Sequence, residues 1–570
     1  MICEVRAQSP KHEFRGAWIA TVINLDWPSR STTSTSVKQA ELQAMLDDLA
    51  ALGVNSVMFQ VRTECDALYN SPFEPWSVYL TGQQGRAPDP YFDPLEFAVD
   101  EAHARGMSLH AWLNPFRCER EVGRYALASD HPVVENPEWM LTLESNSTPG
   151  LFHTILNPGL DAVHDYVAEI VDDVLRRYDV DGIHFDDYFY PYPPYEMGSS
   201  DLSTFDANPR GFANLDDWRR DNINRFVARI NSVVQQVKPD AVFGISPFGI
   251  WRSGTPQGIV GLSGADALFA DARAWLDAGT VDYLAPQLYW PFGGGQDFAA
   301  LADWWVSVSN GRHLYPGLAA YRADPNTAPG TPFASTEIPA QIRFGRSVAD
   351  GHILFRTQNI RGTAVADSVD GLYARPAIPP PMNHRDLFPP DPVDNLRATK
   401  GADGTVTLEW DPSIFGFALA RSFAVYRAEG ASPPDTRAMT ASSESLLGRA
   451  FGPSYTDRPG GSGPYHYVVT ALSSNSAESA ESGVVTVSDL STAADAVPIA
   501  QRLEVWPNPF DDVLSIKGHG EITVHDALGR LVWQSAVGGV REWRAHVAPG
   551  VYLVRLMGAS GPESRLVVHR

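Results

Sequence analysis

Residues 161–189 read DAVHDYVAEIVDDVLRRYDVDGIHFDDYF, a helical pattern followed directly by a strand pattern. Apolar residues three or four apart form one face of the predicted helix: Val163, Val167, Ile170, Val171, Val174 and Leu175. The run GIHFDDYF (182–189) then resembles a buried strand, except for two adjacent aspartates. A helix leading into a buried strand is typical of α/β folds.

The same alternation extends over residues 12–370. Seven further strand-like runs lie at 15–22, 56–62, 108–116, 242–250, 282–290, 313–321 and 351–359, with helical patterns at 38–53, 93–106 and 216–237. Eight buried strands separated by helical spans predict an α/β fold in which residues 12–375 form a (β/α)8 TIM barrel.

The remainder of the chain has a different composition. Residues 376–390 are rich in proline, which predicts a stiff linker. Spaced β signals over 391–488 predict an antiparallel sandwich, and a Ser/Ala-rich connector around 485–500 leads to a second small all-β sandwich at 502–570.

Charge and cysteine content exclude several kinds of partner. The formal net charge is −24, with 44 Lys and Arg against 68 Asp and Glu, so we expect no nucleic acid partner. No run of 18 apolar residues is present, so we expect no membrane span. Cys3, Cys65 and Cys118 lack metal-ligand spacing; a Cys65–Cys118 bridge and free thiols both remain open.

The two adjacent aspartates lie where a parallel barrel carries its functional residues, at the C-terminal end of a strand. If Ile183 and Phe185 face the helices, His184 and Asp186 point into the barrel mouth. Asp187 then points outward or lies just past the strand. We therefore take Asp186 as the first candidate for a catalytic carboxylate and Asp187 as the reserve. A structural or purely binding role is the alternative for each.

Hydrolysis of a glycosidic bond needs two carboxyl groups, one on either side of that bond. Neighbouring strand residues diverge, so a partner from another strand is expected. Glu64, just beyond the strand at 56–62, and Asp271 are the available acids, although each could instead hold a loop through an arginine. The sequence leaves the second catalytic carboxylate unassigned.

Polar and aromatic residues at the other strand ends form a predicted rim that suits a polyhydroxylated ligand. The candidate substrate-binding residues are Arg62, Asn114, Arg117, His184, Tyr188, Tyr190, Arg252, Gln287, Tyr289 and Trp290. Alternatives stay open: the arginines could neutralise the acids, and the aromatic rings could close the core. The histidines are scattered, so we predict neither a metal ion nor another cofactor.

Several motifs occur in order along the predicted barrel: FRGAWIATVINLDWP (14–28), FQVRTECDALY (59–69), AWLNPFR (111–117), NPEWM (136–140), LNPGL (156–160), YDVDGIHFDDYFYP (178–191) and ISPFGIWR (245–252). Together they resemble the glycosyl-hydrolase-like 10 family of bacterial barrels. The resemblance implies a glycosidase acting on an amino-sugar polysaccharide, such as peptidoglycan glycan strands stripped of stem peptides. It also implies an acidic site at Asp186 and Asp187. Arg356 departs from the pattern and could alter a subsite.

Two further resemblances concern the C-terminal third. Residues 391–488 resemble a fibronectin type III module through LEW, YRAEG and YHYVVTA. Residues 502–570 resemble the type A sorting domain of the type IX secretion system through WPNPFDDVLSI, VHDALGRLVW and APGVYLVRL. This implies that the secretion machinery is a partner and that the protein is exported through periplasm and outer membrane, to be secreted or held at the cell surface. The first ten residues, MICEVRAQSP, are too short and too charged for a signal peptide. Export would then imply that they are the remnant of a signal peptide that was trimmed or whose start was misplaced.

Two other functions remain as alternatives to a glycosidase. A non-catalytic carbohydrate-binding barrel would use the same acids only to accept hydrogen bonds from hydroxyl groups. A metal-dependent polysaccharide deacetylase would need a His/Asp cluster that the sequence does not contain.

Overall fold

The computed structural model describes residues 9–488 and 503–569, apart from 386–387, 402, 414–417, 462, 507–512, 527–529, 545 and 559–560. Cys3 lies outside the described residues. So do most of the predicted connector around 485–500 and parts of the motifs WPNPFDDVLSI and VHDALGRLVW.

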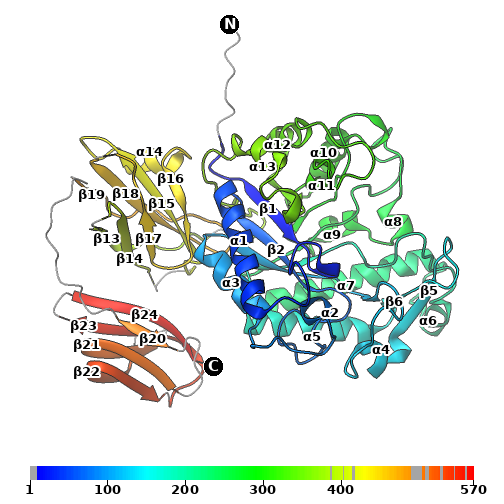
Figure 1. Ribbon diagram of the computed structural model, residues 1–570, viewed down its shortest axis with the longest axis horizontal. Helices are drawn as coiled ribbons and strands as arrows, with labels where there is room; N and C mark the ends of the chain where they lie inside the picture. Colours follow the sequence, from blue (N-terminus) through cyan, green and yellow to red (C-terminus); the bar gives the residue numbers. More distant parts are fainter. Residues whose placement is uncertain are drawn as a thin grey trace, which may run out of the picture.

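The N-terminal domain is built on one parallel sheet (Figure 1). Its segments are β1 (Phe14–Ile19), β2 (Ser56–Arg62), β3 (Ser108–Leu113), β7 (Gly182–Phe185), β8 (Val242–Ile245), β9 (Tyr283–Leu284), β10 (His313–Leu314), β11 (Gly317–Ala319) and β12 (Gly351–Phe355). The sheet runs from β10 through β9, β8, β7, β3, β2, β1 and β12 to β11. Because β10 and β11 are consecutive parts of one stretch of chain, the sheet closes on itself. The predicted barrel is confirmed.

Helices cover the outer surface of this sheet. The principal ones are α1 (Thr35–Leu52), α3 (Pro94–Ala104), α5 (Asp161–Arg177), α7 (Leu215–Val237), α9 (Ala272–Ala278), α10 (Phe298–Ser307), α12 (Glu337–Val348) and α13 (Ala364–Asp370). All six apolar residues of the predicted stripe on α5 are buried. No helix among the described residues is both long and apolar enough to cross a membrane.

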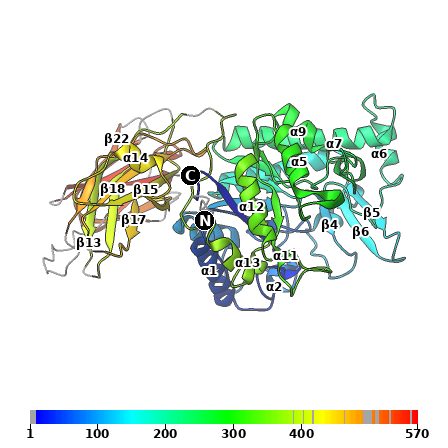
Figure 2. The ribbon, with the colours of Figure 1, turned by 90° about the horizontal axis from the view of Figure 1, so that it is seen from above.

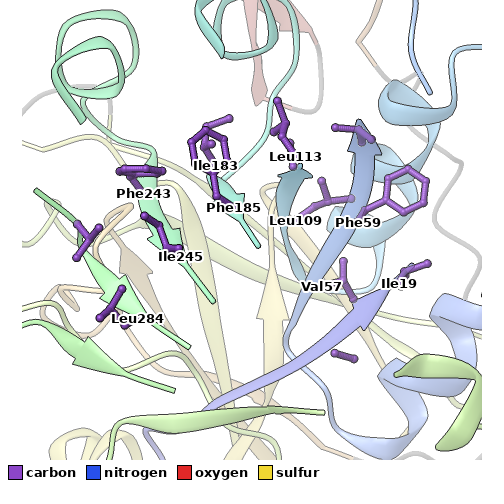
Figure 3. Close-up of a cluster of buried hydrophobic side chains, with 14 of the residues drawn as sticks. Ile19, Val57, Phe59, Leu109, Leu113, Ile183, Phe185, Phe243, Ile245 and Leu284 are labelled. Carbon is purple, nitrogen blue, oxygen red and sulfur yellow. The ribbon is translucent and has the colours of Figure 1, made fainter. Parts of the chain in front are cut away.

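Side chains alternate between the two faces of the barrel strands. Ile183 and Phe185 of β7 point outward into the core beneath the helices (Figure 3). There the Phe185 ring stacks on Phe226 of α7 at 5.7 Å between centroids. His184 points inward and contacts the Tyr283 hydroxyl at 2.9 Å. The predicted phase of this strand is therefore confirmed.

A small antiparallel sheet is inserted after β3, at the C-terminal ends of the barrel strands. It consists of β4 (Arg117–Glu119), β6 (Phe152–Leu156) and β5 (Met140–Glu144), in that order across the sheet. The first residue of β4, Arg117, is thereby held beside the mouth of the barrel.

Two antiparallel all-β units follow, as predicted. The first has one sheet of β13 (Asp394–Lys400), β14 (Val406–Asp411) and β17 (Ser454–Asp457) and another of β16 (Leu446–Ala450), β15 (Ser422–Glu429), β18 (Tyr465–Leu472) and β19 (Val485–Val487). The second is a sheet of β20 (Glu504–Trp506), β21 (Val513–Asp526), β22 (Leu531–Arg544), β23 (Gly550–Gly558) and β24 (Gly561–His569).

The Pro-rich segment packs against the barrel. Ile378 is buried, donates its N–H to the carbonyl of Lys11 and accepts from the N–H of Glu13, at 2.9 and 3.0 Å. Met382 is also buried, inside the barrel at the end where its strands start. These contacts fix where the first sandwich begins.

That sandwich, residues 391–488, docks on the face of the barrel where the strands start (Figures 1 and 2). Arg421 contacts Asp179 and Asp181, both at 2.8 Å, just before β7. Although burial alone would raise it, the pKa of Asp181 is held well below its usual value by Arg421 and His103. Gly106, at φ +74°, contacts the Arg449 backbone, and a Cβ there would overlap the Arg449 carbonyl oxygen.

Candidate active site

A cavity of about 980 Å³, partly open to solvent, lies at the C-terminal ends of the barrel strands. Its walls combine two carboxylates, one guanidinium, amide and hydroxyl groups, and several aromatic rings. The lining residues are Trp18, Ala20, Val22, Leu25, Gln60, Trp112, Arg117, Asp186, Asp187, Tyr188, Tyr192, Ser246, Phe248, Gln287, Tyr289 and Phe355. This location matches the mouth predicted from strand order.

Asp186 lies directly after β7 and is 3% exposed. Its Oδ2 accepts hydrogen bonds from Trp112 Nε1 and Asn114 Nδ2, both at 3.2 Å. Burial, together with the neighbouring negative charge of Asp187, raises the pKa of Asp186 to about 7. The group can therefore hold a proton near neutral pH, as a general acid must.

Asp187 is also 3% exposed and lines the same cavity. The Tyr192 hydroxyl donates a hydrogen bond to its Oδ2. Burial raises the pKa of Asp187 to about 6, with the Tyr192 hydrogen bond acting in the opposite direction. Because β7 ends at Phe185, strand alternation no longer separates the two aspartates, and both side chains reach the cavity.

Asn114 lies directly after β3, and Arg117 is the first residue of β4 in the inserted sheet. Asn114 is fully buried, and its Oδ1 accepts the backbone N–H of Arg117 at 3.1 Å while its amide contacts Asp186. The Arg117 guanidinium lies 4.6 Å from the centre of the Tyr188 ring. This part of the chain therefore places an amide and a guanidinium at the cavity with Asp186, and the guanidinium lies against the Tyr188 ring, which comes from the segment after β7.

The two other predicted acids do not line the cavity. Glu64 is buried and accepts hydrogen bonds from the hydroxyls of Tyr79 and Tyr125, at 3.0 and 2.6 Å. Asp271 caps the N-terminus of α9 and accepts from Trp251 Nε1 at 2.7 Å. Both carboxylates are thus engaged in holding loops.

Of the remaining predicted binding residues, Gln287, Tyr188 and Tyr289 line the cavity. Gln287 donates to the carbonyl of Ser246 at 3.0 Å. Trp290 lies behind the wall, edge-on to Phe248 at 5.7 Å.

Four predicted binding residues are placed elsewhere. Arg62 is buried in an ion pair with Glu74 at 2.5 Å. His184 lies inside the barrel and accepts the Trp18 indole N–H at 3.0 Å, and burial holds its pKa well below the usual value. Tyr190 is buried and accepts a hydrogen bond from Asn222. Arg252 pairs with Asp266 at 3.2 Å.

Several cavity residues were not among the predicted site residues: Trp18, Gln60, Trp112, Tyr192, Ser246, Phe248 and Phe355. Most of these follow or end a barrel strand, so listing every inward position would have found them. Tyr192 has no such signal, because it lies seven residues past the end of β7 in an irregular segment. Arg356, the departure from the family pattern, pairs with Asp26 at 3.0 Å and does not line the cavity.

Metal binding has no obvious ligand set here. Within the part of the chain that the structure describes, no group of three or more His, Cys, Asp or Glu side chains is arranged to hold a metal ion.

A mouth cavity with two buried carboxylates, one of which has its pKa raised to about 7, suits acid–base cleavage of a glycosidic bond. The family model for glycosyl hydrolase-like 10 matches residues 13–333. The chain belongs to this family.

Two relatives with similar sequences are also glycosyl hydrolases. The chain is 36% identical over 441 residues to the glycosyl hydrolase YngK of Bacillus subtilis (strain 168). This alignment covers 74% of this chain and 84% of YngK. It is 36% identical over 405 residues to the glycosyl hydrolase DigH of Escherichia coli (strain K12), covering 65% of this chain and 88% of DigH. This glycosyl hydrolase-like 10 protein is therefore a glycoside hydrolase.

Among solved structures, the glycoside hydrolase domain of PgaB (BpsB) from Bordetella bronchiseptica aligns with a TM-score of 0.44 and 13% sequence identity. The alignment covers 64% of this chain and 99% of that domain.

Proposed function

We propose that this glycoside hydrolase cleaves O-glycosidic bonds in a bacterial cell-wall glycan or a related polysaccharide, with Asp186 and Asp187 as its catalytic carboxylates. The observation that carries the proposal is that both side chains are buried and line one cavity, with pKa values raised to about 7 and about 6. No other carboxylate among the described residues lines that cavity.

Asp186 would act as the general acid. Its Oδ2 accepts hydrogen bonds from Trp112 and Asn114, whereas its Oδ1 accepts the backbone N–H of Tyr188 at 3.5 Å, so Oδ1 would carry the proton toward the glycosidic oxygen. Proton transfer from Asp186 to that oxygen accompanies cleavage of its bond to the anomeric carbon. The resulting Asp186 carboxylate then removes a proton from the water that completes hydrolysis.

Asp187 would remain ionised during this step. Its lower pKa keeps it negative at pH values where Asp186 is still protonated. The carboxylate then stabilises the positive charge that develops on the sugar ring.

A glycan suits the rest of the cavity. The rings of Trp18, Trp112, Tyr188, Phe248 and Tyr289 provide flat apolar surfaces on which sugar faces can stack. The resemblance to family members that act on peptidoglycan strands supports a cell-wall glycan as the substrate.

We also propose that the protein is exported by a type IX secretion system and released or held at the cell surface. The proposal rests on the motifs of residues 502–570 and on the resemblance of residues 391–488 to a fibronectin type III module. Deleting 502–570 from the full chain in a host with that system should retain the enzyme inside the cell. Undiminished export of the deletion variant would contradict this proposal.

Hydrolysis is tested by replacing Asp186 with asparagine. The purified protein should release reducing ends from peptidoglycan glycan strands, and Asp186→Asn should lower kcat about 10²–10⁴-fold. Asp271→Asn is the matched control, since it removes a carboxylate outside the cavity. Full activity in the Asp186→Asn protein, or no reducing ends from any bacterial or plant polysaccharide, would refute the proposal.

A further inference from the structure

A column of polar side chains from four strands lies inside the barrel and ends at the active-site cavity. Trp18 of β1 lines the cavity, and its indole Nε1 donates a hydrogen bond to Nε2 of His184 on β7 at 3.0 Å. The Tyr283 hydroxyl oxygen, from β9, lies 2.9 Å from Nδ1 of His184 and 2.8 Å from Nδ1 of His110 on β3. All four side chains are buried, so their polar groups pair with one another in place of water.

One arrangement of hydrogens satisfies this polar column. An indole N–H can only donate, so Nε2 of His184 accepts. Burial lowers the pKa of His184 well below its usual value, so the ring is neutral and its one N–H lies on Nδ1. Nδ1 then donates to Tyr283, whose hydroxyl donates to Nδ1 of His110. Ser246 Oγ lies 3.2 Å from Nε2 of His184 and itself donates to the carbonyl of Phe185 at 3.3 Å.

The barrel strands leave room for the indole and phenol rings of the column. A Cβ on Gly244 of β8 would lie 2.0 Å from Cζ of Tyr283. A Cβ on Gly317 of β11 would lie 3.0 Å from Cη2 of Trp18. Phe355 packs edge-on to the Trp18 ring, at 5.9 Å between centroids. The indole is therefore held along its rim as well as at its N–H.

We propose that His184 is a positioning residue that orients the Trp18 indole, so that one ring face meets a sugar of the glycan in the cavity. Tyr283 and His110 hold the imidazole of His184 in turn. This inference rests on the proposed hydrolysis of a glycan in the same cavity. An indole fixed before the sugar arrives loses less conformational entropy when the sugar stacks on it, so the glycan binds more tightly.

The first test compares two substitutions of His184. Leucine removes the acceptor for the Trp18 N–H, whereas the amide of glutamine can accept from Trp18 and donate to Tyr283. On peptidoglycan glycan strands, His184→Leu should raise KM about 5- to 10-fold and change kcat less than about threefold, because a stacking surface contributes equally to bound substrate and transition state. His184→Gln should keep KM within about threefold of native. Equal KM values for the two variants would contradict the inference.

A double-mutant cycle separates positioning from packing. Trp18→Phe keeps an aromatic ring but has no N–H for His184 to accept. Adding His184→Leu in this background should therefore change KM less than about twofold. An equally large rise in KM in both backgrounds would overturn the inference.

Two controls identify effects of folding. His164→Leu removes another buried histidine, which contacts the carbonyl of Pro158 at 2.8 Å outside the cavity, and should leave KM unchanged. Thermal unfolding of each variant measures any loss of fold, which would lower the apparent kcat without raising KM.

The tautomer of His184 gives a readout that does not depend on catalysis. Nitrogen NMR of protein labelled with nitrogen-15 histidine should show a proton on Nδ1 and none on Nε2, with no titration between about pH 5 and pH 8. The signal is assigned by its absence from the His184→Gln protein. A proton on Nε2 would contradict the inference, since that nitrogen could not then accept the Trp18 N–H.

Binding distinguishes failure of this inference from failure of the proposed hydrolysis. Calorimetry on the Asp186→Asn protein measures affinity for the strands without turnover, and adding His184→Leu should weaken it about 5- to 10-fold. If no strand is hydrolysed but this loss of affinity is seen, the proposed hydrolysis fails and the role of His184 stands. If reducing ends are released and His184→Leu leaves the affinity unchanged, the role of His184 fails alone. Absence of any binding would refute both.

Discussion

Replacing Asp187 by asparagine should move the alkaline limb of the pH–rate profile to lower pH. If Asp186 is the general acid, as proposed, it must be protonated in the native enzyme, so kcat/KM should fall above about pH 7, roughly tenfold per pH unit. Asp187 must be ionised, so the acidic limb should lie near pH 6. The two groups interact, and the limbs report apparent values for the pair.

The size of the shift follows from the causes of the raised pKa. Burial is the larger cause for Asp186 and is unchanged by the substitution, whereas the raising effect of the Asp187 charge is lost. Removing one neighbouring charge lowers such a pKa by about one unit. The variant should therefore lose about tenfold more activity between pH 6 and pH 8 than the native enzyme does.

The assay is release of reducing ends from glycan strands, with kcat/KM measured across this pH range. The position of the limb is the readout, because the variant also loses a catalytic group and its maximum rate will be lower. The acidic limb assigned to Asp187 should disappear. An alkaline limb that stays in place or moves to higher pH would refute the assignment of Asp186 as the acid.

Three further predictions concern stability. Asp186→Asn should raise the unfolding free energy by up to about 4 kcal/mol near pH 8 and leave it unchanged near pH 4. Because the pKa of Asp186 is raised in the folded protein, its ionisation lowers the unfolding free energy as the pH rises from the pKa of the unfolded chain to about 7, and asparagine does not ionise. Thermal unfolding with no gain at pH 8 would contradict this. Asp271→Ala should cost about 1 kcal/mol through loss of the α9 cap, with kcat/KM within about twofold of native; a large loss of activity would restore Asp271 as a catalytic candidate. Arg421→Met should cost about 2–3 kcal/mol in urea denaturation because it leaves the buried Asp181 with His103 but without its arginine, whereas Lys238→Met should cost less than about 1 kcal/mol. Equal losses for the two variants would contradict this role of Arg421.

The barrel was predictable because its strands and helices are encoded by local periodicity. The spacing of apolar residues in 161–178 defines one buried face, and the structure buries that face. The same reasoning set the phase of β7, where Ile183 and Phe185 face the helices.

The site was less predictable because it depends on where regular structure ends. The expectation that Asp187 diverges from Asp186 holds only while the chain remains a strand, and β7 ends at Phe185. Ion pairs between a strand residue and a residue on a loop likewise cannot be predicted from the local sequence pattern. Arg62 was a reasonable candidate for a substrate-binding residue at the barrel mouth, but its guanidinium forms an ion pair with Glu74, on the loop after β2.

The docked sandwich determines how the enzyme can be presented to an insoluble substrate. Arg449 donates to Ser108 at the start of β3 and to the carbonyl of Asn55 just before β2, while Asp186 lies past the opposite end of β7. A bead or surface coupled to residues 391–488 would consequently leave the candidate active-site cavity facing the medium. The sandwich provides an attachment point for immobilising this hydrolase without obstructing access of a polymer.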